Sequence, residues 1–257
     1  MPFTPRKTPG PRGQPADVEH PRYGGGAGDG DADGGAPAGL PTPILGCQRG
    51  SPDARVTGVA VVNLCDVLNE VRQRPAVGGT RIIGVDGPSG SGKSTLARRL
   101  VTLSGAALVQ IDDFVSWDDL SGWWPRFDQQ VLDPLLGGQD AVYQVRDWAG
   151  DEFGRSLAGW KTVPWAPLIV LDGVTGTRRA TVGRLTYAIW VEAPRAARLE
   201  RGLNRDGHTD IYRDLWSRWM REEDRFFPVD GARDRADLRV DSASDVPHDP
   251  DTQVVTL

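Results

Sequence analysis

The sequence predicts an α/β fold in which parallel strands form a sheet between two layers of helices. Two observations support this prediction. Short apolar runs typical of buried strands alternate along the chain with amphipathic stretches of helical period, which is the pattern of a parallel sheet. The first of these strands, residues 81–86, leads directly into a glycine-rich loop, and a helical pattern follows that loop from Thr95.

The glycine-rich loop fits the phosphate-binding pattern Gly-x-x-x-x-Gly-Lys-Ser/Thr without a mismatch. Its glycines let the backbone approach an anion closely, and the N-terminus of the following helix points at the phosphates. Lys93 adds a positive charge, and Ser94 supplies a hydroxyl for Mg²⁺. The chain is therefore predicted to have a P-loop NTPase fold, a three-layer sandwich. The expected nucleotide-binding residues are Gly87, Ser89, Gly90, Ser91, Gly92, Lys93, Ser94 and Thr95.

The chain divides into a predicted tail and one predicted domain. Residues 1–50 are dense in Gly, Pro and Asp, and such a segment cannot bury enough apolar surface to offset its ordering entropy. We expect a disordered Gly/Pro-rich tail there and a single P-loop domain over residues 51–257. The amphipathic pattern from Val56 to Arg74 predicts a helix that leads into the first strand.

Further strands are predicted at 106–111, 167–173, 185–192 and 236–240, with helices at 194–205 and 210–226. In such sheets ligands bind beyond the carboxyl ends of the strands, where Asp112 and Asp172 fall beside the glycine-rich loop. Mg²⁺ takes one or two carboxylates together with phosphate and water, which makes Ser94, Asp112 and Asp172 the candidate metal set. Asp112 is also placed to accept a proton from an attacking hydroxyl. The alternative for Asp112 is a turn or helix-capping acid.

The segment from Phe114 to Trp165 is far longer than an ordinary crossover between strands. We expect it to be an insertion that binds the molecule carrying the attacking hydroxyl, the acceptor. Aromatic side chains can hold a planar acceptor by stacking. The alternative is that its tryptophans pack the insertion itself. Six of the nine tryptophans lie in it: Trp117, Trp123, Trp124, Trp148, Trp160 and Trp165.

A basic helix face is predicted after the fourth strand. Arg198, Arg201 and Arg205 recur at helical spacing, and a basic face near transferred phosphates would neutralise developing charge. Arg201 and Arg205 are the candidates for a catalytic role. The alternative is a solvated face that Glu200 and Asp206 balance.

Four motifs follow one another along the chain: Gly87 to Thr95, Asp112-Asp113-Phe114, Leu171-Asp172-Gly173, and Arg198 to Arg201 with Arg205-Asp206. Taken in this order, they resemble the uridine kinase and phosphoribulokinase group of P-loop kinases over residues 81–240. The resemblance implies transfer of the γ-phosphoryl group of Mg-ATP to a hydroxyl of a small molecule, most readily a nucleoside. By this resemblance Lys93 and Asp112 are catalytic, with Asp112 as the general base, and residues 194–227 form a lid that carries Arg201 and Arg205. The acceptor-binding residues that it implies are Asp128, Tyr143, Arg146 and Asp147.

The Arg-Gly-Arg that the group has after Arg205-Asp206 is missing, and Gly207-His208 stand there instead. Three further positions depart from the pattern of this group. Gly202 stands where the lid often has a second arginine, Val115 replaces a tyrosine, and Asp172 replaces a glutamate. These departures concern the acceptor more than the nucleotide. Two alternatives therefore stay open: a kinase for a specialised natural product or antibiotic, and a regulatory ATPase without an acceptor.

Composition narrows the expected partners. A net charge of −5 argues against general binding to nucleic acid, and no apolar run approaches the roughly 18 residues of a membrane span. The two cysteines, Cys47 and Cys65, are too few for a disulfide framework, so a reduced, cytoplasmic setting is expected. The expected partner is a small molecule. Kinases of the group often self-associate, so a homo-oligomer is one further expectation.

Overall fold

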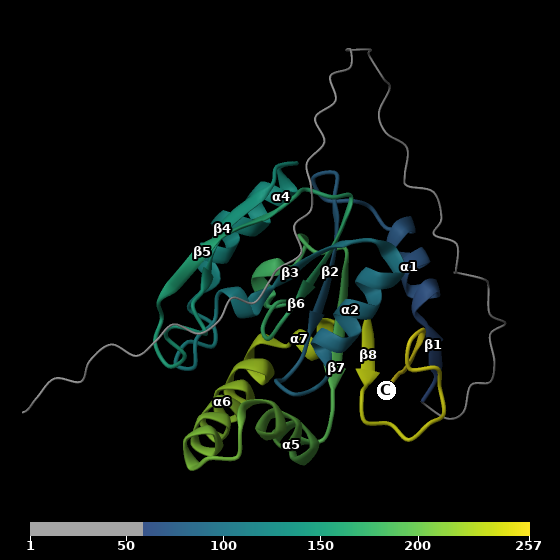
Figure 1. Ribbon diagram of the computed structural model, residues 1–257. Coiled ribbons are helices and arrows are strands. Elements are labelled where there is room, and N and C mark those ends of the chain that lie inside the picture. The colour runs from purple at the N-terminus through teal and green to yellow at the C-terminus, as the bar shows by residue number, and fades with distance from the viewer. Residues whose placement is uncertain (1–58) are drawn as a thin grey trace, which may run out of the picture. The chain divides into compact units, whose positions relative to one another are not determined.

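The computed structural model describes residues 59–257, so the predicted tail and the first residues of the predicted domain lie outside the described residues. A sheet of five parallel strands forms the centre, in the order β3-β6-β2-β7-β8 (Figure 1). This sheet, with the glycine-rich loop between its central strand and a helix, confirms the predicted α/β P-loop NTPase fold. The strands are β2 (Arg81–Asp86), β3 (Ala107–Gln110), β6 (Leu168–Asp172), β7 (Tyr187–Glu192) and β8 (Leu238–Asp241).

One face of the sheet is covered by α1 (Leu64–Gln73) and α2 (Lys93–Ser104). Both helices are amphipathic, and their apolar stripes meet the apolar side chains of the central strands in one core. Leu68, Leu96 and Leu100 are almost fully buried in that core.

The opposite face of the sheet is covered by the long insertion between β3 and β6. Its apolar residues, including Phe127 and Tyr143, form a second core with Ile169 and Leu171 of β6. Trp123 is buried in this core, whereas Trp160 is 67% exposed on the hairpin. The insertion consists of η1 (Ile111–Asp113), α3 (Trp124–Phe127), η2 (Asp128–Leu132), α4 (Asp133–Leu136) and the hairpin of β4 (Ala141–Arg146) and β5 (Leu157–Val163).

Two helices lie beyond the carboxyl ends of the strands. They are α5 (Arg195–Asp206) and α6 (Asp210–Asp230), which Figure 1 shows below the sheet. They correspond to the region that was predicted as a lid. The short elements η3 (Arg179–Thr181) and α7 (Ala232–Arg235) complete this end.

The helix predicted from Val56 is wrong for residues 61–63. These residues form β1 (Val61–Asn63), which pairs antiparallel with β9 (Gln253–Val255), and α1 begins only at Leu64, where the Asn63 side chain accepts a hydrogen bond from the backbone N–H of Cys65 (2.9 Å). The sequence pattern misses this strand because its partner is about 190 residues away. The segment after β9 continues along the outer side of β8, where Thr256 bridges Val240. No helix within residues 59–257 is long and apolar enough to cross a membrane.

Candidate nucleotide and acceptor site

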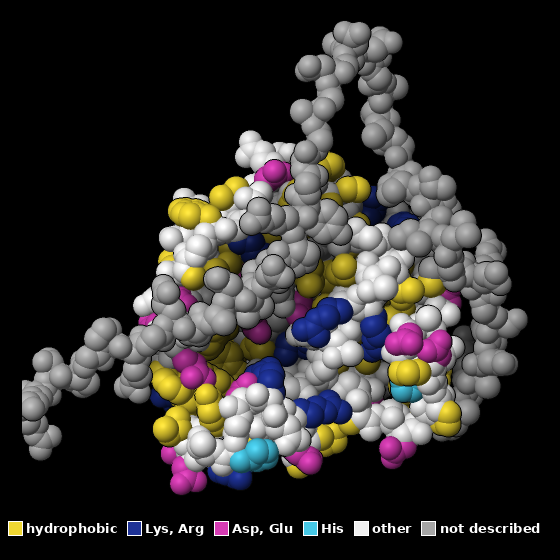
Figure 2. Space-filling model, in the orientation of Figure 1, with side chains coloured by type: hydrophobic (Ala, Val, Ile, Leu, Met, Phe, Trp, Pro, Cys, Tyr) yellow, Lys and Arg dark blue, Asp and Glu magenta, His cyan; other side chains and the backbone are white. Residues whose placement is uncertain are grey.

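A cavity of about 630 Å³ opens at the carboxyl end of the sheet. The glycine-rich loop forms one wall, Asp112 and Val115 another, and α5 and α6 a third. Lys and Arg side chains gather around the hollow in the middle of the face that Figure 2 shows. The cavity thus brings the glycine-rich loop and Asp112 together, whereas Asp172 is not among its lining residues and contributes only through the following Gly173. Its basic side chains are Lys93, Arg98, Arg201 and Arg205.

The glycine-rich loop has the backbone shape of an anion cradle. Gly87, Gly90 and Gly92 have φ angles of 137°, 75° and 94°, which favour glycine because other residues are strained there. A Cβ atom at Gly87 would also overlap the backbone of Val191. Lys93 is 7% exposed, and its Nζ donates a hydrogen bond to Pro88 O (3.0 Å). These features fit a bound phosphate chain.

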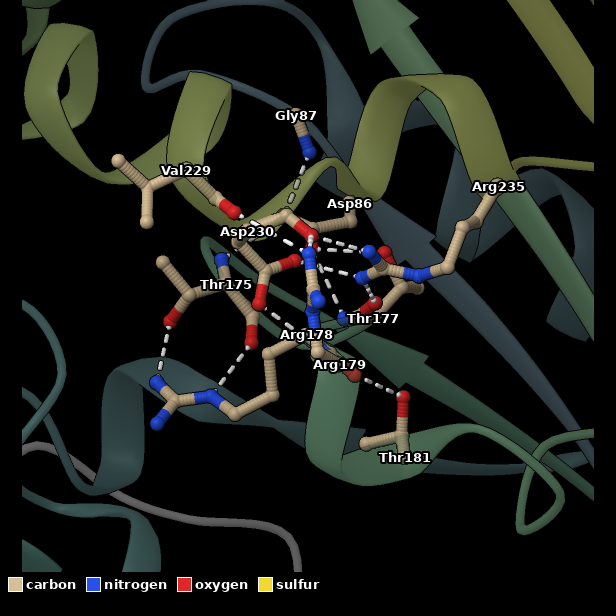
Figure 3. A network of polar contacts seen from close by, with 10 residues as sticks. All are labelled: Asp86, Gly87, Thr175, Thr177, Arg178, Arg179, Thr181, Val229, Asp230 and Arg235. Atoms are coloured by element: carbon tan, nitrogen blue, oxygen red, sulfur yellow. Dashed lines mark hydrogen bonds and ion pairs between the residues drawn. The ribbon is translucent and has the colours of Figure 1, made fainter.

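Asp86, the last residue of β2, braces this loop from below (Figure 3). Its Oδ1 accepts hydrogen bonds from the N–H groups of Gly87 (2.6 Å) and Thr175 (2.8 Å). Its Oδ2 accepts from both the N–H (2.8 Å) and the hydroxyl (2.9 Å) of Thr177. Complete burial raises the pKa of Asp86, and the hydrogen bonds from Thr177 and Gly87 act against that rise. Asp86 therefore joins the glycine-rich loop to the loop after β6.

The loop after β6 contains a strained residue. Thr175 has a φ angle of 62°, which is unusual for a β-branched residue. Besides its contact with Asp86, its hydroxyl accepts a hydrogen bond from Nη2 of Arg178 (2.7 Å), whose Nε donates to Thr175 O (3.0 Å). Arg178 is buried against the rings of Trp123 and Trp124, at 4.7 and 4.8 Å from their centroids. These contacts hold a conformation that alone costs about 1–3 kcal/mol.

The two adjacent acids after β3 have separate surroundings. Asp113 turns toward the insertion, where it accepts hydrogen bonds from the Tyr143 hydroxyl (2.9 Å) and Lys161 Nζ (2.8 Å). Asp112 lines the cavity and is open to its solvent, although protein atoms crowd it closely. This desolvation raises the pKa of Asp112, while Lys93 and Arg205 act to lower it. Because water reaches the carboxyl group, solvent screens part of both effects.

Asp172 ends β6 beside the loop helix. It is 4% exposed, and burial raises its pKa to about 6 against the influence of Lys93 and Ser94. Its Oδ1 is buried without a hydrogen-bond partner among the described residues. An orphaned carboxylate oxygen beside a serine hydroxyl fits a Mg²⁺ ion, whose other ligands would be phosphate and water. No cluster of three or more acidic, His or Cys ligands occurs in residues 59–257.

The two predicted catalytic arginines occupy different positions at the cavity. Nη1 of Arg201 donates to Gly90 O (3.2 Å) and to Ser242 Oγ (3.1 Å), so this arginine rests on the glycine-rich loop. Arg205 forms two hydrogen bonds with Asp206, from Nε (2.6 Å) and Nη2 (3.0 Å). The Trp216 indole donates to the same carboxylate (2.9 Å). Asp206 therefore orients Arg205 on the side of the cavity that holds Asp112.

The surroundings of Gly202 leave no room for a side chain. A Cβ atom at this position would overlap the ring of Trp216, which is 1% exposed. We expect Gly202→Ala to lower the free energy of unfolding by about 1–3 kcal/mol, because the ring has no free space into which to move. Thermal unfolding measures the change. Gly159→Ala is the control, since nothing lies within 4 Å of a Cβ at that exposed position, and an equal effect of the two changes would contradict this account.

Four tryptophans line the cavity: Trp117, Trp148, Trp216 and Trp219. Trp117 is the centre of this aromatic wall, with ring centroids at 5.9–6.4 Å from the other three in edge-to-face contacts. Trp216 and Trp219 are buried, whereas Trp117 and Trp148 keep part of their surface exposed. The Trp148 indole donates to the backbone oxygen of Asp112 (2.8 Å).

The four residues predicted to bind the acceptor do not line this cavity. Asp128 pairs with Arg184, and the buried Tyr143 donates to Asp113. Arg146 donates to four backbone carbonyls of the loop at 147–156, and Asp147 caps the N–H of Gly150 (2.7 Å). Such contacts organise the insertion, and the acceptor-binding role of these residues stays a prediction.

Other residues of the site were not predicted from the sequence. The role of Asp86 could have been recognised from the sequence. It is an acid at the end of a buried strand directly before the glycine-rich loop, and a buried acid requires hydrogen-bond partners. Glu223, which is buried in an ion pair with Arg198 of α5, could not be recognised from the sequence. It lies among four other charged residues of the same helix. Trp216 and Trp219 fall outside the insertion, where the aromatic residues were sought.

No protein-family model and no curated protein sequence matches the chain. Among solved structures, the chain is similar to a possible uridine kinase from Bacillus stearothermophilus, with a TM-score of 0.49 and 18% identity over 68% of this chain and 96% of that one. It is also similar to a putative fructose transport system kinase from Silicibacter sp., with a TM-score of 0.41 and 22% identity over 55% of this chain and 78% of that one. Likenesses at these identities concern the fold alone.

Proposed function

We propose that the protein is a phosphotransferase that moves the γ-phosphoryl group of Mg-ATP to a hydroxyl of a small molecule, with a nucleoside as the leading candidate. The observation that supports this proposal most directly is the position of Asp112. Its carboxyl group shares the cavity with Lys93 and Arg205 and lies beside the aromatic wall, where a second molecule has room. An acid between the glycine-rich loop and that space can take a proton from a second substrate.

The residues of the chain would divide the work between binding and proton transfer. The loop N–H groups and Lys93 bind the phosphates, and Arg201 and Arg205 neutralise charge that develops on the transferred group. Asp112 accepts the proton of the attacking hydroxyl. The oxygen of that hydroxyl forms a bond to the γ-phosphorus while the bond between this phosphorus and the leaving ADP breaks. Ser94 and Asp172 would hold Mg²⁺, which supplies further charge neutralisation when bound.

The aromatic wall is the proposed place of the acceptor. Trp148 is fixed next to Asp112 by its hydrogen bond to the backbone of that residue. Glu152 lines the same cavity, where its Oε1 accepts a hydrogen bond from the Tyr212 hydroxyl (2.6 Å). In this proposal the flat base of a nucleoside stacks on the Trp148 indole, and the hydroxyls of its sugar meet Glu152 and Asp112. The same wall also suits a planar natural product, which is the second candidate acceptor.

The test is ADP release from Mg-ATP with a panel of nucleosides, hydroxylated natural products and other hydroxylated metabolites, each paired with a blank without acceptor. Release that depends on a nucleoside supports the leading proposal. Release that depends on another hydroxylated compound assigns the acceptor to that class. Release without any acceptor, or nucleotide binding without release, contradicts the transferase and favours a regulatory ATPase.

A further inference from the structure

A buried glutamate of α6 contacts the glycine-rich loop from outside the cavity. Glu223 is 1% exposed. Its Oε1 accepts hydrogen bonds from the backbone N–H of Ser89 (2.7 Å) and from the Trp219 indole (2.9 Å). Its Oε2 accepts from Nη1 of Arg198 on α5 (3.0 Å). One carboxylate therefore joins two helices to the loop.

Its neighbours contact the remaining polar groups of the same loop residue. Nη1 of Arg198 also donates to Ser89 O (3.3 Å), and the Trp219 indole also donates to Ser89 Oγ (2.7 Å). The N–H, the carbonyl and the hydroxyl of Ser89 thus all meet Arg198, Trp219 or Glu223. We call these three residues the Ser89 clamp.

Stability alone is a poor explanation for such a group. A buried ion pair costs desolvation, and well-packed apolar residues would often be as stable in its place. The clamp instead holds Ser89, the residue directly before Gly90 and Ser91 of the glycine-rich loop. Helix α5 approaches so closely there that a Cβ at Gly90 would overlap the backbone of Arg198. One turn further along α5, Arg201 donates to Gly90 O.

We infer that the Ser89 clamp is a positioning device that fixes the glycine-rich loop to α5 and α6, so that the loop and the arginines of α5 meet the nucleotide as one rigid unit. The inference rests on the proposed function only to the extent that the loop binds a nucleotide. Its consequence is that loss of the clamp weakens nucleotide binding even where the clamp residues touch no nucleotide and the protein stays folded.

The decisive experiment compares Glu223→Gln with Glu222→Gln. Both changes remove one negative charge from the same helix, but Glu222 is exposed and, among residues 59–257, pairs only with Arg225 (2.6 Å). Binding of Mg-ATP is measured by calorimetry without an acceptor, and thermal unfolding is measured on the same samples. We expect Glu223→Gln to raise the dissociation constant about tenfold or more, because it removes a hydrogen bond between charged groups, and Glu222→Gln to leave it unchanged.

A second pair of variants guards against loss of the fold. Trp219→Phe keeps an aromatic side chain but removes the pyrrole part of the indole, together with the N–H that the clamp uses. Trp160→Phe makes the same change on the exposed hairpin. We expect Trp219→Phe to weaken Mg-ATP binding and Trp160→Phe to have no effect. If the wild type binds Mg-ATP and both clamp variants bind it equally well, or lose only thermal stability, the clamp inference is overturned. If the wild type binds no nucleotide, the proposed function fails instead.

Discussion

Asp112→Asn is expected to lower turnover about a hundredfold to ten-thousandfold, since the amide cannot accept the proton of the attacking hydroxyl. Affinity for the nucleotide is expected to change much less, because the glycine-rich loop and Lys93 supply most of the phosphate contacts. The measurement is acceptor-dependent ADP release, together with nucleotide binding to the same variant. Raising the Mg²⁺ concentration should not restore turnover, which separates loss of the base from weaker metal binding.

Asp113→Asn is the matched control for this change. It removes the same charge from the adjacent position, but the Asp113 side chain faces Tyr143 and Lys161 and not the cavity. We expect this variant to retain most of its turnover. Full activity in Asp112→Asn, or equal losses in both variants, would contradict the assignment of Asp112 as the base.

Asp86→Ala is expected to lower the free energy of unfolding by about 3 kcal/mol or more. The change leaves the buried N–H groups of Gly87, Thr175 and Thr177 without acceptors, and each such group costs about 1–3 kcal/mol. For a domain of this size the midpoint of thermal unfolding should fall by roughly 6 °C or more. Nucleotide binding should weaken as well, because the start of the glycine-rich loop loses its brace.

The control for Asp86→Ala is Asp234→Ala. The Asp234 side chain is 81% exposed, and its nearest cation, Arg239 Nη2, lies 3.8 Å away. Surface ion pairs of this kind contribute about 0–1 kcal/mol, so thermal unfolding should hardly change. Similar stabilities of the two variants would show that the hydrogen bonds of Asp86 do not stabilise the loop.

The predictions of helices and strands were correct where the apolar periodicity within the segment itself is strong. The strand at 81–86 and the helix after the loop agree with β2 and α2, because strong apolar periodicity and the glycine pattern coincide there. The helix predicted from Val56 failed at residues 61–63, where pairing with β9 overrides the local pattern. The hairpin of β4 and β5 was not predicted within the insertion, since tertiary packing against η2 and η1 defines it.

The same distinction applies to the candidate site. The predicted strand ends placed Asp112 and Asp172 at the same edge of the sheet, because the carboxyl ends of parallel strands share one edge. The direction in which each side chain points could not be predicted from the sequence. Arg198 and Arg201 are three residues apart on α5, yet Arg198 turns into the clamp and Arg201 lies at the cavity. Arg198 instead pairs with Glu223, a residue of another helix.

The pairing of β1 with β9 has a consequence for solubility. The outer edge of a sheet offers unpaired N–H and C=O groups to any passing chain, and β8 is such an edge strand. The segment after β9 occupies part of that edge, through the bridge between Val240 and Thr256 and the hydrogen bond from the Leu257 N–H to Arg239 O (3.1 Å). Residues far from the cavity thereby cover part of an edge that could otherwise pair with a strand of another chain.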